Sequence, residues 1–248
     1  MKKITGKTYL DWYENMLLWR KFEDKLAAKY IQQKIRGFLH LYNGQEAVLA
    51  GCLHSIDPKK DRMISSYRSH VHAIGLGEDP KFVMAELTGR KDGISKGKGG
   101  SMHMFSKANR FYGGHGIVGA QVPIGVGIGF AHKYRNDKKI SRVYMGDGAI
   151  NNGQVFEAFN LASLWNLPVL FIIENNRYSM GTAVDRSAAG KDLYERATVF
   201  GIKGEKVNGM NFFDVSQAAI RARDHIYEHS KPYVLEMDTY RYRGHSMS

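Results

Sequence analysis

One stretch of the chain constrains the fold more than any other. Residues 142–180 read RVYMGDGAINNGQVFEAFNLASLWNLPVLFIIENNRYSM. Residues 142–145 form a short apolar run, 154–165 have helical spacing, and 168–173 form an apolar run rich in β-forming residues. A buried strand, a helix and a second buried strand predict a parallel sheet. The 248 residues accommodate one such α/β domain, and no repeat or linker divides them.

Polar residues follow both expected strands. Asp147 comes directly after the first strand, and Asn176 comes after the second. Parallel strands that are joined by a helix open their carboxyl ends on one edge of the sheet, so we expect these two side chains to meet. The helix after Asp147 directs its positive N-terminus to the same place, and Gly146 and Gly148 leave the backbone accessible. One carboxylate, one amide oxygen and backbone carbonyls are too few for a calcium cage, but they suit Mg²⁺, which completes its shell with water and phosphates.

Other motifs compete for these residues. A lone GDG is a common turn. An EF-hand loop starting at Asp147 fails, because Ala149, Asn152 and Ala158 occupy its third, sixth and twelfth positions. GISKGKG (93–99) is one residue short of a phosphate-binding P-loop and lacks the following Ser or Thr. GHGIVG (114–119) fits the dinucleotide-binding pattern, but the preceding RFYG predicts a poor strand and no acidic residue closes a second strand. An NAD-dependent oxidoreductase remains an alternative on that motif.

The composition narrows the function classes. The formal net charge of +12 favours an anionic partner, either nucleic acid or a phosphorylated small molecule. The densest basic patch (89–100) has no interleaved aromatic residues, so we expect no nucleic-acid partner, although a basic nucleic-acid-binding protein stays open. Cys52 is the single cysteine, which fits a reducing compartment. No apolar run reaches the roughly 18 residues of a membrane span, and the N-terminus lacks a signal core. We therefore expect a cytoplasmic protein.

Further elements are predicted outside the central unit. A helix over 8–34 has Leu10, Tyr13, Leu17 and Leu26 on one apolar stripe. Asp79 and Pro80 predict the start of a helix that ends near Gly89. The glycine-rich segment 113–134 leads into a helix whose small residues allow another backbone to approach closely, in particular Gly119, Gly125 and Gly129. A helix over 212–229, capped by Asp214, and a strand over 233–242 complete the pattern.

The central stretch resembles the thiamine-diphosphate motif, GDG with a terminal NN, of the alpha subunits of 2-oxo acid dehydrogenases. GFLHLYNGQEA (37–47), SSYRSH (65–70), AELTGRKDGISKGKGGSMHMF (85–105), FYGGHGIVGAQVPIG (111–125) and TYRYRGHSMS (239–248) resemble further blocks of that family, in order. GQEA and YRSH are more similar to the pyruvate or acetoin members than to the branched-chain members. The resemblance implies an α/β fold, a three-layer parallel sheet of the thiamine-diphosphate-binding class with an N-terminal helical extension. It also implies a single phosphate-site domain over 1–248, without the helical segment that follows GHSMS in the family.

The resemblance implies an activity and partners. The expected reaction is decarboxylation of pyruvate on thiamine diphosphate with Mg²⁺, followed by reductive acetylation of a lipoyl group on the dihydrolipoyl acyltransferase. Acetoin and branched-chain 2-oxo acids remain alternative substrates. Enzymes similar to this one place the glutamate that activates the cofactor on a second, pyrimidine-binding domain. The resemblance therefore implies a beta subunit and an α2β2 assembly.

The resemblance also assigns residue roles. It implies that Mg²⁺ is bound by Asp147, Asn176 and the backbone carbonyl of Tyr178. Further cofactor contacts are implied for Tyr67, Arg68, Ser106, Gly116, Val118, Gly148, Ala149 and His245. His40, Arg68 and His245 are expected to stabilise a carboxylate or a developing oxyanion. Ser246 matches a serine that is a regulatory phosphorylation site in mitochondrial relatives. His70 and His72 are interpreted as core or surface residues and not as a zinc pair.

Overall fold

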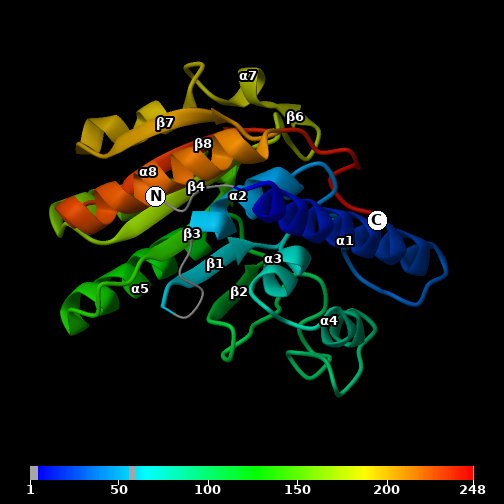
Figure 1. The fold of residues 1–248 in the computed structure, drawn as a ribbon. Coiled ribbons are helices and arrows are strands. Elements are labelled where there is room, and N and C mark those ends of the chain that lie inside the picture. The colour runs from blue at the N-terminus through cyan, green and yellow to red at the C-terminus, as the bar shows by residue number, and fades with distance from the viewer. Residues whose placement is uncertain (1–4, 56–59, 248) are drawn as a thin grey trace.

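A six-stranded sheet forms the centre of the protein, in a computed structural model that describes residues 5–55 and 60–247 (Figure 1). The strand order is β2-β1-β3-β4-β8-β7, and each neighbouring pair is parallel. The strands are β1 (Arg62–Ser66), β2 (Phe111–His115), β3 (Ser141–Gly146), β4 (Val169–Asn175), β7 (Lys203–Asn208) and β8 (Tyr233–Asp238). β3 and β4 are direct neighbours, and α6 (Gly153–Leu164) joins them. The predicted strand–helix–strand unit is confirmed.

Helices cover both faces of the sheet. One core lies between the sheet and α1 (Gly6–Ile31), α2 (Glu46–Ser55), α3 (His70–Gly75) and α8 (Phe212–His229). The other core lies between the sheet and α5 (Gln121–Arg135), α6 and the 3-10 helix η2 (Leu193–Phe200). Successive strand residues alternate between the two cores, with Tyr144 in the first and Val143 in the second. The expected three-layer α/β architecture with an N-terminal helix is confirmed.

Smaller elements complete the chain. α4 is Pro80–Leu87, the 3-10 helix η1 is Ala149–Asn151, and α7 is Val184–Ser187. β5 (Tyr178–Ser179) and β6 (Thr182–Ala183) form a short antiparallel ribbon. No helix in residues 5–55 or 60–247 combines the length and the hydropathy that a membrane crossing requires.

Two predicted helix starts have different outcomes. α4 begins as expected, because the Asp79 carboxylate accepts a hydrogen bond from the Lys81 N–H at 2.9 Å and Pro80 is the first helical residue. The predicted cap of α8 at Asp214 is wrong. The cap is Asn211, three residues before Asp214, and the Asn211 side chain accepts from the Phe213 N–H at 2.9 Å. The helix itself spans 212–229 as expected.

The expected apolar stripe of α1 is also wrong in its first half. Leu10, Tyr13 and Leu17 are exposed, whereas Trp19 and Leu26 are fully buried. The residues of α1 that are buried all lie between Trp19 and Ala27, where α1 lies beside α2 (Figure 1). The spacing predicts the helix, but it does not show which part of a long helix packs against a neighbour.

The glycines of α5 do permit close packing, but against the sheet of the same chain. A Cβ atom on Gly125 would lie 2.3 Å from Val143 Cγ2, and one on Gly129 would lie 2.5 Å from Val169 Cγ2. Gly127, between them, faces open space. These two glycines therefore set the distance between helix and sheet and do not form an outward-facing contact surface.

The segment before GHGIVG is a strand, contrary to the expectation from RFYG. Phe111–His115 forms β2 and pairs with β1. β1 nevertheless lies between β2 and β3 in the sheet. The strands on either side of α5 are therefore not neighbours, unlike those of a dinucleotide-binding strand–helix–strand unit.

Candidate active site at the carboxyl edge of the sheet

A cavity of about 240 Å³ opens where β1, β3 and β4 end. The residues that follow these three strands line it together, although they are far apart in the sequence. The predicted site residues among its lining are Tyr67, Arg68, Val118, Asp147, Gly148, Ala149, Asn176, Tyr178 and His245. The structure thus brings most of the expected cofactor residues to one place.

Asp147 is the buried acid of this cavity. Asp147 is 3% exposed, and Ser179 Oγ donates a hydrogen bond to Asp147 Oδ2 at 3.0 Å. Burial raises the pKa of the Asp147 carboxyl, because the charged form loses water contacts. A Cβ atom on Gly148 would lie 2.1 Å from Ser179 Oγ, so only glycine leaves room for this arrangement. The η1 turn follows directly, and α6 begins only at Gly153.

Asn176 is held in a defined orientation by Gln45. Asn176 Nδ2 donates to Gln45 Oε1 at 2.9 Å, and both residues are buried. This bond commits the amide nitrogen and leaves the Asn176 Oδ1 atom available on the other side. Oδ1 accepts from Arg241 Nη1 at 3.3 Å.

Arg241 places a positive charge among the expected metal ligands. The same Nη1 that contacts Asn176 Oδ1 also donates to the Tyr178 carbonyl at 3.3 Å. Burial lowers the pKa of Arg241, and the negative charge of Asp147 opposes that shift. Asn176 Oδ1 and the Tyr178 carbonyl, two of the three expected Mg²⁺ ligands, therefore accept hydrogen bonds from Arg241. The negative charge of Asp147, the third expected ligand, attracts the same guanidinium.

These oxygens fit Mg²⁺. A carboxylate, an amide oxygen and a backbone carbonyl are hard ligands, and they leave positions open for phosphate oxygens. Within the described ranges no group of three or more His, Cys, Asp or Glu side chains is arranged for a metal ion. A magnesium site here depends on the mixed set of Asp147, Asn176 and Tyr178, and binding the ion would replace both Arg241 hydrogen bonds.

Three rings cluster beside this charge centre. The His40 ring lies 4.4 Å from Tyr67 and 5.0 Å from His245, between ring centroids. Burial, followed by the charge of Arg68, lowers the pKa of His40 to about 3 and that of His245 to about 4. Both imidazoles are therefore neutral at pH 7. Their buried Nδ1 atoms find no hydrogen-bond partner among the described residues. His245 lines the cavity, whereas His40 lies behind it, outside the lining.

Arg68 anchors the turn that carries His245. Its Nη2 donates to the His245 carbonyl at 2.8 Å, and its Nη1 donates to the Leu41 carbonyl at 2.5 Å. Burial lowers the pKa of Arg68 to about 10, which still leaves it charged at neutral pH. Arg68 thus lines the cavity as a fixed positive charge while both terminal nitrogens hold backbone.

Glu174 lies next to these groups at the end of β4. It lines the cavity, is 3% exposed, and accepts a hydrogen bond from the Tyr42 hydroxyl. Burial raises the pKa of Glu174 to about 7, against the opposing influence of Tyr42 and Arg68. Sequence reasoning did not single it out.

Two expected cofactor residues lie outside the cavity lining. The Ser106 hydroxyl donates to Glu78 and accepts from the Asn109 N–H at 3.2 Å. Gly116 follows β2, and a Cβ atom there would lie 3.1 Å from His103 Nε2. Ser106 therefore holds its own loop together, and Gly116 leaves room for His103.

His70 and His72 are core residues, as interpreted. His70 contacts Glu23 at 3.1 Å through Nδ1 and Ser101 at 2.7 Å through Nε2. His72 is fully buried, with its ring centroid 4.9 Å from Tyr42 and 4.8 Å from Tyr144.

Sequence reasoning missed Gln45, Glu174 and Arg241. Gln45 and Arg241 lie inside the quoted blocks GQEA and TYRYRGHS, and Glu174 directly precedes the asparagine pair. A charged or amide residue within such a block could have been predicted as a site residue, because these residue types are seldom buried without a partner. Gln45 and Arg241 both bond to Asn176, which is 131 residues away from Gln45 in the sequence and 65 residues away from Arg241.

The fold and this edge define a class of α/β enzymes that bind a phosphate-bearing cofactor where parallel strands end. The family model described as "Dehydrogenase E1 component" matches residues 14–248, and the chain belongs to this family.

Curated relatives agree with this assignment. The chain is 54% identical over 246 residues to a pyruvate dehydrogenase E1 component subunit alpha of Rickettsia bellii, covering 99% of this chain and 75% of the relative. The protein of the same name from Zymomonas mobilis is 54% identical over 239 residues, 96% of this chain and 68% of the relative. A testis-specific mitochondrial form from Rattus norvegicus is 50% identical over 245 residues, 99% of this chain and 61% of the relative.

Proposed function

We propose that this chain is the alpha subunit of the decarboxylating component of a pyruvate dehydrogenase complex. In this proposal it acts on pyruvate with thiamine diphosphate and Mg²⁺, and passes the acetyl group to a lipoyl group on the acyltransferase. The observation that carries the proposal is the convergence of Asp147, Asn176 and the Tyr178 carbonyl on one cationic group at the carboxyl edge. The names of the relatives support the choice of pyruvate.

The residues of this chain would bind and orient the cofactor. Asp147, Asn176 and the Tyr178 carbonyl would hold Mg²⁺, while Gly148 and Ala149 would leave the backbone close to the diphosphate. Arg241, released from two of these oxygens, remains within the same cavity as a positive charge for phosphate. Tyr67, Gly116, Val118 and Ser106 stay expected cofactor contacts, although Gly116 and Ser106 lie outside the described cavity lining.

The histidines would supply neutral hydrogen-bonding groups near the reacting carbonyl. Thiamine diphosphate itself supplies the electron sink for decarboxylation. His40 and His245, both neutral at pH 7, can each donate or accept one proton through the Nδ1 atom that is free of protein partners. Arg68 would hold the His245 turn in place and favour a nearby carboxylate or oxyanion.

The proposal includes partners and a location. A beta subunit would complete the active site, in an α2β2 assembly that acts on the lipoyl domain of the acyltransferase in the cytoplasm. The described residues form one α/β domain in this proposal, and the cofactor-activating glutamate would come from the beta subunit.

Reconstitution tests the proposal directly. CO₂ release from pyruvate should be undetectable with this chain alone at saturating thiamine diphosphate and Mg²⁺, and should appear when the beta chain is added. CO₂ release from branched-chain 2-oxo acids and acetaldehyde release from acetoin, which has no carboxylate to lose, decide the substrate. Turnover of pyruvate by the isolated chain would contradict the divided active site, and preference for another substrate would replace pyruvate.

A further inference from the structure

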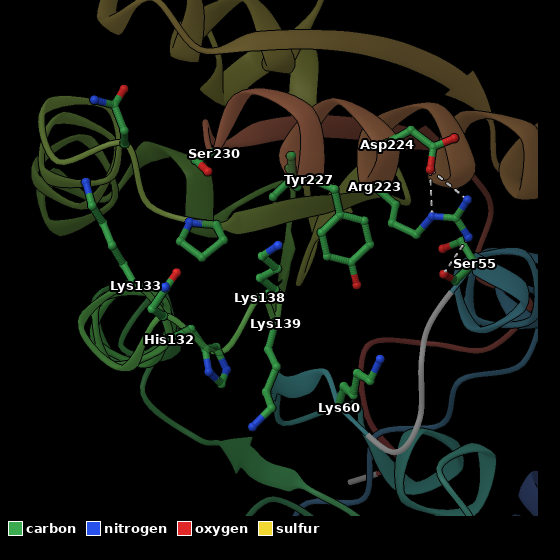
Figure 2. A pocket seen from close by; sticks show the side chains of 14 residues that line it. Ser55, Lys60, His132, Lys133, Lys138, Lys139, Arg223, Asp224, Tyr227 and Ser230 are labelled. Carbon is green, nitrogen blue, oxygen red and sulfur yellow. Dashed lines mark hydrogen bonds and ion pairs between the residues drawn. The ribbon is translucent and has the colours of Figure 1, made fainter.

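A larger cavity, of about 1040 Å³, lies at the amino edge of the sheet, where the strands begin (Figure 2). Arg223 in its lining pairs with Asp224 at 2.7 Å, and Lys139 pairs with Asp137 at 2.9 Å. Part of the charge around this cavity is therefore neutralised within the chain. A less ordinary use of polar side chains is found at the carboxyl edge, where two amides bind the same carbonyl oxygen.

Asn152 stands at the start of α6 but does not cap the helix. Its backbone is extended, with φ −74° and ψ 136°, and asparagine is a favoured residue at such an N-cap position. Its side chain nevertheless makes no capping hydrogen bond. Asn152 Nδ2 instead donates to the Val118 carbonyl at 3.3 Å, in a segment 34 residues earlier. The side chain thus serves a long-range contact in place of the local one that its position favours.

Gln154 makes the same contact from the first turn of α6. Gln154 Nε2 donates to the Val118 carbonyl at 3.2 Å. A carbonyl oxygen has two lone pairs, so the two amides together satisfy the Val118 oxygen. We call Asn152 and Gln154 the amide clamp, because they fix the peptide that joins Val118 to Gly119 against the start of α6.

Gly119 is adapted to the amide clamp in two ways. Its φ of +84° lies in the left-handed region, which favours glycine. A Cβ atom on Gly119 would lie 2.9 Å from Gln154 Nε2 and 3.0 Å from Asn152 Nδ2. A larger residue would therefore crowd both amides at the point where they meet the carbonyl. The backbone conformation and the available space both require glycine here.

The amide clamp connects two walls of the cavity at the carboxyl edge. Gly148 and Ala149, shortly before the clamp in the sequence, line one wall, and Val118 and Gly119 line the other. In the proposed function Gly148 and Ala149 lie close to the diphosphate. Val118 is apolar, so it suits the ring part of the cofactor and not its phosphates. The clamp therefore sets the separation between a phosphate-binding wall and a ring-binding wall.

We propose that Asn152 and Gln154 are positioning residues for thiamine diphosphate, which hold the ring-binding wall in register with the phosphate-binding wall. This inference rests on the proposed function, because it takes thiamine diphosphate as the ligand. A segment that is already ordered before binding lowers the entropy cost of holding a ligand that touches both walls. Loss of the clamp should therefore weaken a ligand that spans both walls and spare one that occupies the phosphate-binding wall alone.

Titration calorimetry of the alpha–beta assembly with two ligands tests this proposal. Thiamine diphosphate spans both walls, whereas inorganic pyrophosphate occupies only the phosphate-binding wall, each with Mg²⁺. The test variant is Asn152→Ser together with Gln154→Leu. Serine is a favoured N-cap residue but is too short to replace the contact with Val118, and leucine has no donor. The matched control is Asn151→Ser, because Asn151 is an exposed neighbouring amide that bonds to Arg196 and not to Val118.

We expect the double variant to bind thiamine diphosphate about tenfold more weakly, which corresponds to the loss of two hydrogen bonds that order the segment. Its affinity for pyrophosphate should be unchanged. Its melting temperature should stay equal or rise, because the serine caps α6. Both affinities should be unchanged in Asn151→Ser. The single variant Gln154→Leu repeats the test with the Asn152 backbone and side chain intact, and should show a smaller loss in the same direction.

Three results would overturn the proposal. One is equal affinity of the unmodified protein and the double variant for thiamine diphosphate. Another is an equal loss of affinity for both ligands, because the substitutions would then act on the phosphate-binding wall. The third is a loss that is accompanied by a marked fall in melting temperature in both variants, which would assign the amides to folding alone. Absence of thiamine diphosphate binding by the unmodified protein would instead contradict the proposed function, so the two failures are distinguishable.

Discussion

The two edges of the same sheet carry opposite sets of groups. At the carboxyl edge, β3 and β4 are followed by Asp147 and Asn176, whose oxygens surround a cationic group. At the amino edge, lysines precede β3 and end α5. In a parallel α/β sheet, helix N-termini lie at the first edge and helix C-termini at the second. The topology alone therefore makes the carboxyl edge suited to phosphate, whereas the helix C-termini at the amino edge disfavour anions.

Burial differs as much as charge does. Asp147 and Arg68 are nearly inaccessible and fixed by hydrogen bonds, whereas Lys133 and Lys138 are exposed. Changes at the carboxyl edge should accordingly have large and specific effects, and changes of exposed lysines at the amino edge should have little effect on folding.

The largest effect is expected from a negative charge at the carboxyl edge. Ser246 directly follows His245, which lines the cavity that holds Asp147, so Ser246→Glu adds a carboxylate beside that lining. Repulsion of the cofactor diphosphate should lower acetyl transfer with the beta chain by more than about 100-fold. Ser246→Ala should retain most of the activity. Full turnover by Ser246→Glu would contradict the expected repulsion between a carboxylate at this position and the cofactor diphosphate.

The next effect concerns α5, which runs from one edge to the other. Gly125→Ala should lower the free energy of unfolding by about 1–3 kcal/mol, because the new methyl would collide with Val143. Gly127→Ala meets open space in the same helix and should raise it by up to about 1 kcal/mol. Urea unfolding of both variants measures the difference. Equal effects would show that α5 does not pack as described.

A smaller effect is expected when the orientation of Asn176 is released. Gln45→Leu removes the acceptor of the Asn176 amide nitrogen, and the amide can then turn its oxygen away from the metal position. We expect Mg²⁺-dependent binding of thiamine diphosphate to weaken about tenfold. Gln45→Glu, which keeps an acceptor, is the control. Unchanged affinity in Gln45→Leu would contradict the orienting role.

The smallest effect is a pH dependence of stability. Burial lowers the pKa of His72 to about 3, whereas an unfolded histidine takes up a proton near pH 6.5. The unfolded chain therefore binds the extra proton between these values, and stability falls as the pH falls from about 6.5 toward 3. His72→Gln should reduce this slope by about 1.4 kcal/mol per pH unit in urea titrations at pH 5–6. An unaltered slope would show that His72 does not remain neutral in the folded protein.

The sequence was most informative where local pattern and topology act together. The strand–helix–strand unit over 142–175 and the meeting of Asp147 with Asn176 follow from periodicity and from the geometry of parallel strands. The start of α4 follows from local capping chemistry at Asp79. Each of these depends on neighbours that are close in the sequence or on a rule that holds for every parallel sheet.

Tertiary contacts decided the remainder. β2 contains two glycines and forms because β1 offers it a pairing edge. Leu10 and Tyr13 have helical spacing, but the buried part of α1 begins only at Trp19. Arg241 reaches Asn176 from a segment after the last strand, which no local pattern encodes.

We propose that the carboxyl edge is a metal and diphosphate site built on Asp147. Titration calorimetry of thiamine diphosphate with Mg²⁺, on the alpha–beta assembly with and without Asp147→Ala, tests it most directly. We expect the variant to fold normally, because Asp147 follows the strand and has one side-chain partner in Ser179. Its Mg²⁺-dependent affinity should fall by about 100-fold or more. Affinity equal to that of the unmodified protein would contradict the assignment of the site.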